Sequence, residues 1–138
     1  MYVRDFKAED ETEVIRLWGK CNLLRVWNDP KKDIKRKLEA SPGLFLVGVL
    51  NCKVCATAMG GFDGHRGWVN YLAVEPSVWN SGFGKQIMGE LEQRLRSMGC
   101  PKINIQIRSD NITAVEFYRK IGYSPDDVVC VGKRLIDD

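Results

Sequence analysis

The segment Trp79-Asn80-Ser81-Gly82-Phe83-Gly84 lies between a predicted strand and a predicted helix, and it decides the fold. The strand ends in Leu72-Ala73-Val74-Glu75-Pro76, and the helix begins near Phe83. A glycine-bearing loop that leads into a helix can bind an anion, because unpaired N–H groups point out of it and the helix dipole favours negative charge. The order strand, loop, helix therefore predicts an anion-binding site in an α/β protein.

Two common nucleotide-binding loops do not match this segment. A Walker A loop needs a glycine five residues before Gly84-Lys85 and a Ser or Thr after the lysine, but those positions hold Trp79 and Gln86. The Gly-x-Gly-x-x-Gly pattern of dinucleotide-binding proteins is absent. The residues therefore give no support for Mg-nucleotide or dinucleotide chemistry.

Hydrophobic periodicity predicts alternating strands and helices on both sides of this loop. Strands are predicted at residues 1–6, 44–50, 54–60, 68–74, 102–107 and 127–132. Helices are predicted at residues 9–21, 30–40, 83–98 and 111–121. The stripe on the third helix consists of Ile87, Met88, Leu91, Leu95 and Met98. Gly60-Gly61 suggests a bend or a close backbone approach. Without a repeat or a linker, residues 1–138 are predicted to form a single α/β domain.

Composition and charge narrow the class of protein. The chain is 44% hydrophobic and 28% charged, which is typical of a globular domain. Its net charge of +3 is mild, and the basic run at residues 31–37 is interrupted by acidic and apolar residues. A solvated helix face explains that run better than a nucleic-acid site. No apolar stretch approaches the ~20 residues that span a bilayer, so no membrane association is predicted.

Five cysteines, an odd number, and the lack of a signal sequence predict a reducing, cytoplasmic setting. Cys52 and Cys55 have the Cys-x-x-Cys spacing, but a zinc site needs further ligands, and His65 is the only histidine. No βαβ unit follows, as a thioredoxin-type motif would require. The preferred interpretation is packing within a hairpin, with no metal bound.

The order of elements resembles the GNAT N-acetyltransferase family over essentially the whole chain. Residues 72–76 are similar to the family strand whose splayed end holds the pantetheine arm of acyl-CoA through its backbone. Residues 79–84 are similar to the Arg/Gln-x-x-Gly-x-Gly/Ala pyrophosphate loop, and residues 111–123 to the signature Asn-x-x-Ala-x-x-x-Tyr-x-x-x-Gly-Phe/Tyr. Residues 24–30, 60–67 and 132–136 also resemble a small bacterial YpeA-type subgroup without an assigned acceptor.

The resemblance implies a fold, a reaction and a set of site residues. The implied fold is a mixed, mostly antiparallel sheet flanked by helices, and the implied reaction transfers acetyl from acetyl-CoA to a primary amine in a ternary complex. Tyr118 matches the tyrosine that protonates the departing CoA thiolate, although a phenol there can also be simple core packing. The residues implied to bind acetyl-CoA are Leu72, Ala73, Val74, Asn80, Ser81, Gly82, Phe83, Gly84, Lys85, Asn111 and Ala114.

The loop departs from the family pattern at its first two positions. Trp79 replaces the usual Arg or Gln, and Asn80 replaces a glycine. Pyrophosphate is held mainly by backbone N–H groups, and asparagine tolerates left-handed φ, so the geometry can survive the exchange. Loss of a guanidinium removes a contact typically worth ~1.5–3 kcal/mol, which Lys85 could partly replace. A plain helix start without a ligand is the alternative interpretation.

The acceptor side is less defined. In the GNAT family, which the chain resembles, the first two helices line the acceptor cleft. The resemblance therefore implies that Trp27, Asn28 and Asp29 are candidate substrate-binding residues. Asp63 in the predicted hairpin is a further candidate. Trp27 could equally be a packing anchor. The amine must lose a proton to attack, and the candidate bases are Asp29, Asp63, Glu75 and His65. A lone His or Asp in a turn is more often a turn former.

Two classes of function therefore stay open at this point. The first is an N-acetyltransferase acting on a small-molecule, peptide or protein amine, with no nucleic-acid partner; homodimers are common in the family. The second is a non-catalytic module that binds acyl-CoA or senses another ligand. Trp79 and the absence of a carboxylate between residues 68 and 74 motivate the second class.

Overall fold

The computed structural model describes residues 1–138 and contains five strands and four α-helices. The strands are β1 (Tyr2–Asp5), β2 (Phe45–Leu50), β3 (Lys53–Phe62), β4 (Gly67–Val74) and β5 (Ile103–Ile105). The helices are α1 (Glu11–Lys20), α2 (Pro30–Ala40), α3 (Phe83–Ser97) and α4 (Ile112–Lys120). Short 3₁₀ turns lie at Ala8–Asp10, Pro42–Leu44 and Pro76–Val78. None of the helices combines the length and the apolar composition needed to cross a membrane.

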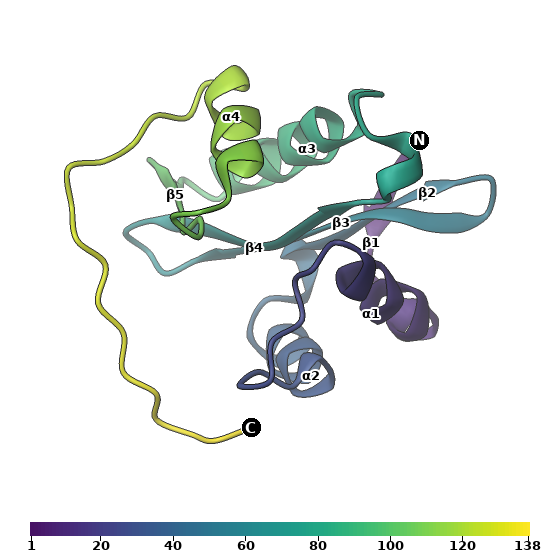
Figure 1. Cartoon of the computed structure of the whole chain (residues 1–138), viewed down its shortest axis with the longest axis horizontal. Coiled ribbons are helices and arrows are strands. Elements are labelled where there is room, and N and C mark those ends of the chain that lie inside the picture. The colour runs from purple at the N-terminus through teal and green to yellow at the C-terminus, as the bar shows by residue number, and fades with distance from the viewer.

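The five strands form one sheet in the order β1-β2-β3-β4-β5. Neighbouring strands are antiparallel from β1 to β4, whereas β4 and β5 are parallel. Figure 1 shows α1 and α2 on one face of the sheet and α3 and α4 on the other. The predicted fold class, a mixed and mostly antiparallel sheet flanked by helices, is confirmed.

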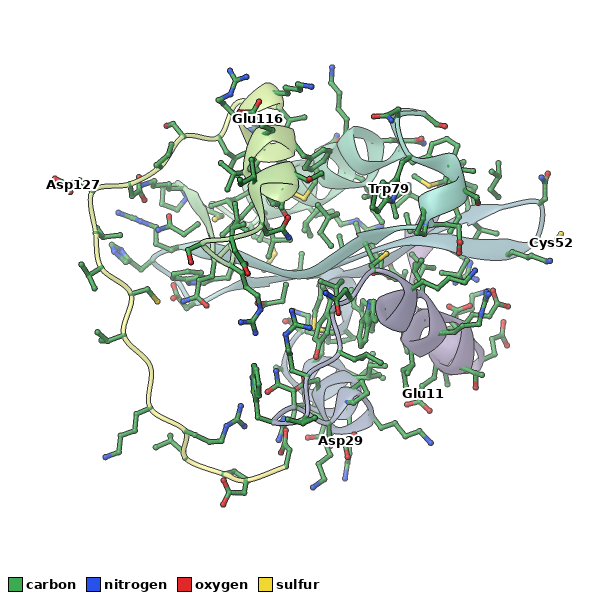
Figure 2. All side chains as sticks on the ribbon, viewed as in Figure 1. Glu11, Asp29, Cys52, Trp79, Glu116 and Asp127 are labelled. Carbon is green, nitrogen blue, oxygen red and sulfur yellow. The ribbon has the colours of Figure 1, made fainter.

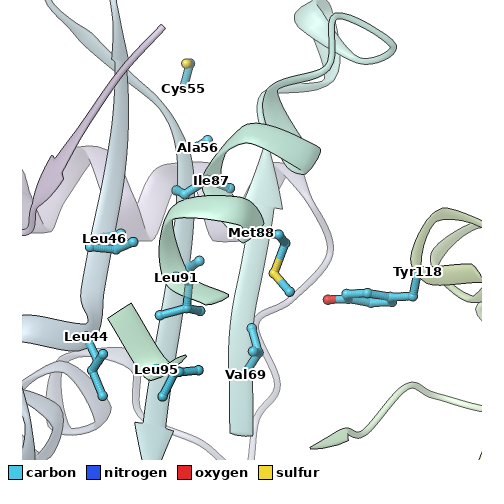
Figure 3. Close-up of a cluster of buried hydrophobic side chains, with 11 residues drawn as sticks. Leu44, Leu46, Cys55, Ala56, Val69, Ile87, Met88, Leu91, Leu95 and Tyr118 are labelled. Carbon is cyan, nitrogen blue, oxygen red and sulfur yellow. The ribbon is translucent and has the colours of Figure 1, made fainter. Parts of the chain in front are cut away.

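Each face of the sheet carries its own hydrophobic cluster. On one face α3 contributes Ile87, Met88, Leu91 and Leu95, all buried as the predicted stripe requires (Figure 3). On the other face α1 contributes Val14, Leu17 and Trp18. The prediction for Met98 was wrong: its side chain is half exposed, because α3 ends at Ser97 and Met98 lies at its C-cap.

Gly60 lets α3 approach the sheet closely, as its position in the sequence predicted. A Cβ atom at Gly60 would lie 2.5 Å from Cδ1 of Leu91, a fully buried residue of α3. Strand β3 does not end there but continues to Phe62, and its residues from Gly60 to Phe62 pair with β4. The pair Gly60–Leu91 therefore sets the distance between sheet and helix.

Gly60→Ala is expected to lower the free energy of unfolding by about 1–3 kcal/mol, because a methyl group would overpack a closed core. Gly89→Ala is the matched control: Gly89 lies on the exposed side of α3 with nothing near its missing Cβ. That change should raise stability by about 0.4–1 kcal/mol. Urea denaturation followed by circular dichroism measures both, and equal effects of the two substitutions would contradict the close approach.

The predicted hairpin location of the two spaced cysteines is confirmed. Cys52 lies in the exposed turn between β2 and β3, and Cys55 points into the cluster beneath α3. Figure 2 shows Cys52 at the tip of this hairpin. No group of three or more His, Cys, Asp or Glu side chains is arranged to hold a metal ion.

The prediction of a last strand at residues 127–132 was wrong. This segment is extended and contacts the β5 region only through side chains, with Asp126 accepting from Lys102 at 2.8 Å and Gln106 donating to Cys130 at 2.6 Å. Without backbone partners, valine-rich sequence does not become a strand. Figure 1 shows the tail crossing from α4 toward α2. The strand predicted at 102–107 is correspondingly short.

Candidate functional site: an opening between β4 and β5

The sheet opens between β4 and β5. The two strands pair only over Gly67–Val69 and Ile103–Ile105, and β4 then continues without β5 to Val74. Just past the last pair, Tyr71 has φ +50, and the register with β3 shifts between Thr57 and Met59. This is a β-bulge, which bends its strand and increases its twist.

The three strand residues predicted to bind acetyl-CoA lie in this opening. Leu72, Ala73 and Val74 follow the bulge, and β3 pairs with the last two of them on the other side. Their main-chain groups on the β5 side have no strand partner. Residues 72–74 therefore have no strand partner on the β5 side, although the Val74 carbonyl accepts from the side chains of Trp79 and Cys21.

The loop between β4 and α3 has the backbone expected of an anion site. Asn80 and Gly82 have φ +65 and +82, so asparagine does adopt the left-handed conformation here. Gly82 is the N-cap of α3 and has no side chain to cap it. The first helical bond runs from Gln86 N–H to the Gly82 carbonyl at 3.0 Å, which leaves the preceding amides of Phe83, Gly84 and Lys85 without helical partners.

Gly84 allows the loop to lie close to α4, the helix that carries the catalytic candidate Tyr118. A Cβ atom there would lie 2.8 Å from the ring of Phe117, so the first turn of α3 packs directly against α4. On α4, Asn111 is the N-cap, and its side chain accepts from Ala114 N–H at 3.1 Å. The predicted roles of Asn111 and Ala114 thus include a structural one, the start of the helix that carries Tyr118.

Tyr118 points from α4 into the cluster under α3, toward Met88 (Figure 3). It is 7% exposed, and its ring meets Phe117 and Tyr123 edge to face. Burial raises the pKa of Tyr118 above its ordinary value. The phenol is therefore protonated throughout the neutral range and available as a proton donor.

Trp79 does not face the loop that it precedes. Its indole N–H donates to the Val74 carbonyl at 2.6 Å, so the ring folds back over the end of β4 (Figure 2). The thiol of Cys21 lies 3.3 Å from the same carbonyl. The first side chain of the loop is consequently hydrogen-bonded to the strand that precedes it.

Trp79→Arg is expected to leave the Kd for acetyl-CoA within about threefold of wild type, since the Trp79 side chain is bonded to the end of β4 and we expect the backbone amides of the loop to bind the anion. Isothermal titration calorimetry provides the measurement, and Lys85→Gln tests the remaining nearby cation. A tenfold gain in affinity, about 1.4 kcal/mol, would instead show that a guanidinium at position 79 reaches the ligand.

On the other side of the sheet, Trp27 and Asn28 each contact an arginine from a distant segment of the chain. The Arg108 guanidinium lies 5.4 Å from the centre of the Trp27 ring, and Arg134 donates to the Asn28 side chain at 2.9 Å. Trp27 is about half exposed. These contacts join the α1–α2 loop to the end of β5 and to the C-terminal segment.

The remaining acidic candidates have structural partners. Asp29 caps α2 and accepts from the N–H groups of Lys31 and Lys32. Asp63 closes the β3–β4 turn by accepting from His65 and Arg66 N–H, which lowers the pKa of its carboxyl. Glu75 pairs with Lys20 at 3.0 Å. His65 is exposed in the same turn as Asp63.

Sequence reasoning missed a hydrogen bond between Tyr71 and Asp33. The Tyr71 hydroxyl donates to the Asp33 carboxylate at 2.6 Å, which connects the bulge of β4 to α2. The two residues are 38 positions apart. No local pattern marks the pair, although an aspartate on the first turns of a helix after Pro30 could have been noted.

Comparison with known proteins identifies this arrangement. The family model of the acetyltransferase (GNAT) family matches residues 9–123, which include the opened sheet, the loop and α4. The chain belongs to the GNAT acetyltransferase family. It is an enzyme of the N-acetyltransferase type.

Individual relatives agree with this assignment. The chain is 46% identical over 138 residues to an acetyltransferase of Yersinia pseudotuberculosis, covering 100% of this chain and 98% of the relative. Its fold is similar to that of an aminoglycoside 6'-N-acetyltransferase from Acinetobacter haemolyticus, with a TM-score of 0.75, 14% identity and coverage of 99% and 100%. The ribosomal-protein-S18-alanine N-acetyltransferase of Escherichia coli gives a TM-score of 0.72, 15% identity and coverage of 88% and 76%.

Proposed function

We propose that the protein transfers the acetyl group of acetyl-CoA to a primary amine by direct attack in a ternary complex, as a single cytoplasmic domain. The opening between β4 and β5 carries this proposal, because residues 72–74 have no strand partner on the β5 side, the start of α3 has no side-chain cap, and Leu72 and Val74 pack against the cluster that includes Tyr118. In the reaction the amine nitrogen attacks the thioester carbonyl, the C–S bond breaks, and the thiolate takes up a proton.

Each part of acetyl-CoA has a matching group in the opening. Main-chain groups of Leu72, Ala73 and Val74 on the β5 side, other than the Val74 carbonyl already bonded to Trp79, would hold the pantetheine arm and the developing oxyanion. The amides of residues 80–85 would hold the pyrophosphate at the positive end of α3. The neutral phenol of Tyr118 would give its proton to the departing thiolate.

The acceptor would enter from the face that carries α1 and α2. Trp27 and Asn28 line that approach together with Arg108. By their names, the solved relatives given above act on an aminoglycoside antibiotic and on an alanine of ribosomal protein S18. Both small-molecule and peptide amines are therefore reasonable first probes for this chain.

The test has a binding step and a turnover step. Calorimetry with acetyl-CoA should give saturable binding, and a thiol-reactive dye should detect CoA release with a panel containing kanamycin, spermidine and a peptide with N-terminal alanine. The matched control omits the amine, so that CoA released by hydrolysis alone is subtracted. Absence of acetyl-CoA binding would overturn the proposal.

A second candidate is a module that binds acyl-CoA without catalysis. One observation favours it: the Trp79 indole already occupies the Val74 carbonyl at the end of the strand that would bind pantetheine. Saturable acetyl-CoA binding without CoA release on the whole panel would favour this module over the enzyme.

A further inference from the structure

Tyr71 lies where the sheet opens, on the opposite face from Tyr118. It follows the last residue of β4 that pairs with β5, Val69, by two positions. Its side chain packs with the cluster beside α1, whereas Tyr118 belongs to the cluster beneath α3. A thioester held at the opening would therefore have one phenol on each side of the sheet.

The conformation of Tyr71 is fixed by a buried support. Its ring stacks on Trp18 with centroids 3.8 Å apart and an interplanar angle of 13°. The hydroxyl of Thr57, itself fully buried, donates to the Tyr71 carbonyl at 2.8 Å and accepts from the Trp18 indole at 2.9 Å. A non-glycine residue at φ +50 is costly, and such strain persists only where surrounding structure enforces it, commonly at functional sites.

The hydroxyl of Tyr71 is directed at a carboxylate. It donates to Asp33 at 2.6 Å, and Asp33 also accepts from Arg36 at 2.9 Å. Beyond Arg36 lies Asp138, which accepts from the same guanidinium at 2.7 Å. Burial and the neighbouring Asp33 raise the pKa of Tyr71 above its ordinary value, so the phenol is neutral and cannot itself act as a permanent anion.

We propose that Tyr71 and Asp33 form the pair that accepts the proton of the acceptor amine, an inference that rests on the proposed function. The lone pair of the Tyr71 oxygen takes one proton from the ammonium form of the acceptor, which frees the nitrogen lone pair to bond to the thioester carbon. The phenolic proton passes at the same time to the Asp33 carboxylate. Tyr71 ends neutral as it began, Asp33 becomes a carboxylic acid, and that acid returns its proton to solvent.

Arg36 holds the Asp33 carboxylate of this pair in position. Its guanidinium lies 2.9 Å from the Asp33 carboxylate oxygen that does not accept from Tyr71. Asp138 accepts from the same guanidinium at 2.7 Å. The Asp33 side chain is about one-quarter exposed, which gives its proton a route to solvent.

A comparison of two nucleophiles distinguishes a role of Tyr71 and Asp33 in proton removal from a purely structural role. The primary amine of the panel above that gives the highest rate is mostly protonated at pH 7 and must lose a proton, whereas hydroxylamine is mostly neutral at that pH. Tyr71→Phe and Asp33→Asn are each expected to lower kcat with the primary amine by about 100-fold. Both variants should keep the hydroxylamine rate within about threefold, and the double variant should be no slower than either single one.

Two substitutions elsewhere on the surface serve as controls. Tyr2→Phe and Asp110→Asn remove an exposed phenol and an exposed carboxylate elsewhere, and neither should change either rate. Tyr71→Phe keeps the ring on Trp18, and thermal unfolding checks that the variants fold. Equal losses with both nucleophiles, or no loss with the primary amine, would overturn the inference. If wild type acetylates neither nucleophile although it binds acetyl-CoA, the proposed function itself fails, and this inference with it.

Discussion

Tyr118→Phe is expected to slow CoA release by about 100-fold or more while leaving acetyl-CoA affinity nearly unchanged. The substitution removes only the hydroxyl, so the ring still fills its place against Met88 and Phe117. What is lost is the proton for the departing thiolate, and positioned proton donors typically contribute 10²–10⁴-fold. Stopped-flow or steady-state CoA release gives kcat, and calorimetry gives the Kd.

Tyr123→Phe is the matched control for this result. Tyr123 packs edge to face on Tyr118 and donates its hydroxyl to Glu92 at 2.9 Å, away from the thioester. Its loss should leave kcat within about threefold, since the pattern at this position accepts either Phe or Tyr. A Tyr118→Phe enzyme with wild-type kcat would mean that solvent, not this phenol, protonates the thiolate.

Trp18→Ala is expected to lower the free energy of unfolding by about 3–5 kcal/mol. Trp18 is fully buried, stacks on both Phe45 and Tyr71, and donates to Thr57. Removing it leaves a large cavity between α1 and the sheet and takes away the donor from which the Thr57 hydroxyl accepts. Urea denaturation followed by circular dichroism measures the change without relying on tryptophan fluorescence.

Trp79→Ala provides the comparison for the same residue type at the surface. Trp79 is about half exposed and makes one hydrogen bond, so its loss should cost no more than about 1 kcal/mol. Similar losses at positions 18 and 79 would contradict the assignment of Trp18 to the core. The same Trp18→Ala protein should also show reduced turnover, because Tyr71 loses the ring that holds it.

Much of the fold was predictable because its signals are local. The stripe Ile87–Leu95 has helical period, Pro30 marks the start of α2, and Asn111 precedes α4 as an N-cap. The loop with Asn80 and Gly82 could be recognised for the same reason, since left-handed backbone depends on residue type at single positions. These signals need no knowledge of distant contacts.

What sequence reasoning missed depends on pairing between distant segments. Tyr71 alternates like any strand residue, and only the bulge against β3 turns its side chain toward Asp33 on α2. Residues 127–132 have strand composition, yet a strand exists only where another backbone pairs with it. The contact of Trp27 with Arg108 likewise joins segments that no local pattern connects.

The two faces of the sheet differ in how freely the protein can diversify. Tyr118 and the helix start at Gly84 belong to the packed core, so a substitution that alters this chemistry also alters stability. Trp27, Asn28 and Arg108 lie in loops with few packing constraints, where substitutions are thermodynamically cheap. Under the proposed function, the architecture separates an acetyl-donor half that resists mutation from an acceptor half that tolerates it, which would let selectivity for the amine evolve while the transfer step is retained.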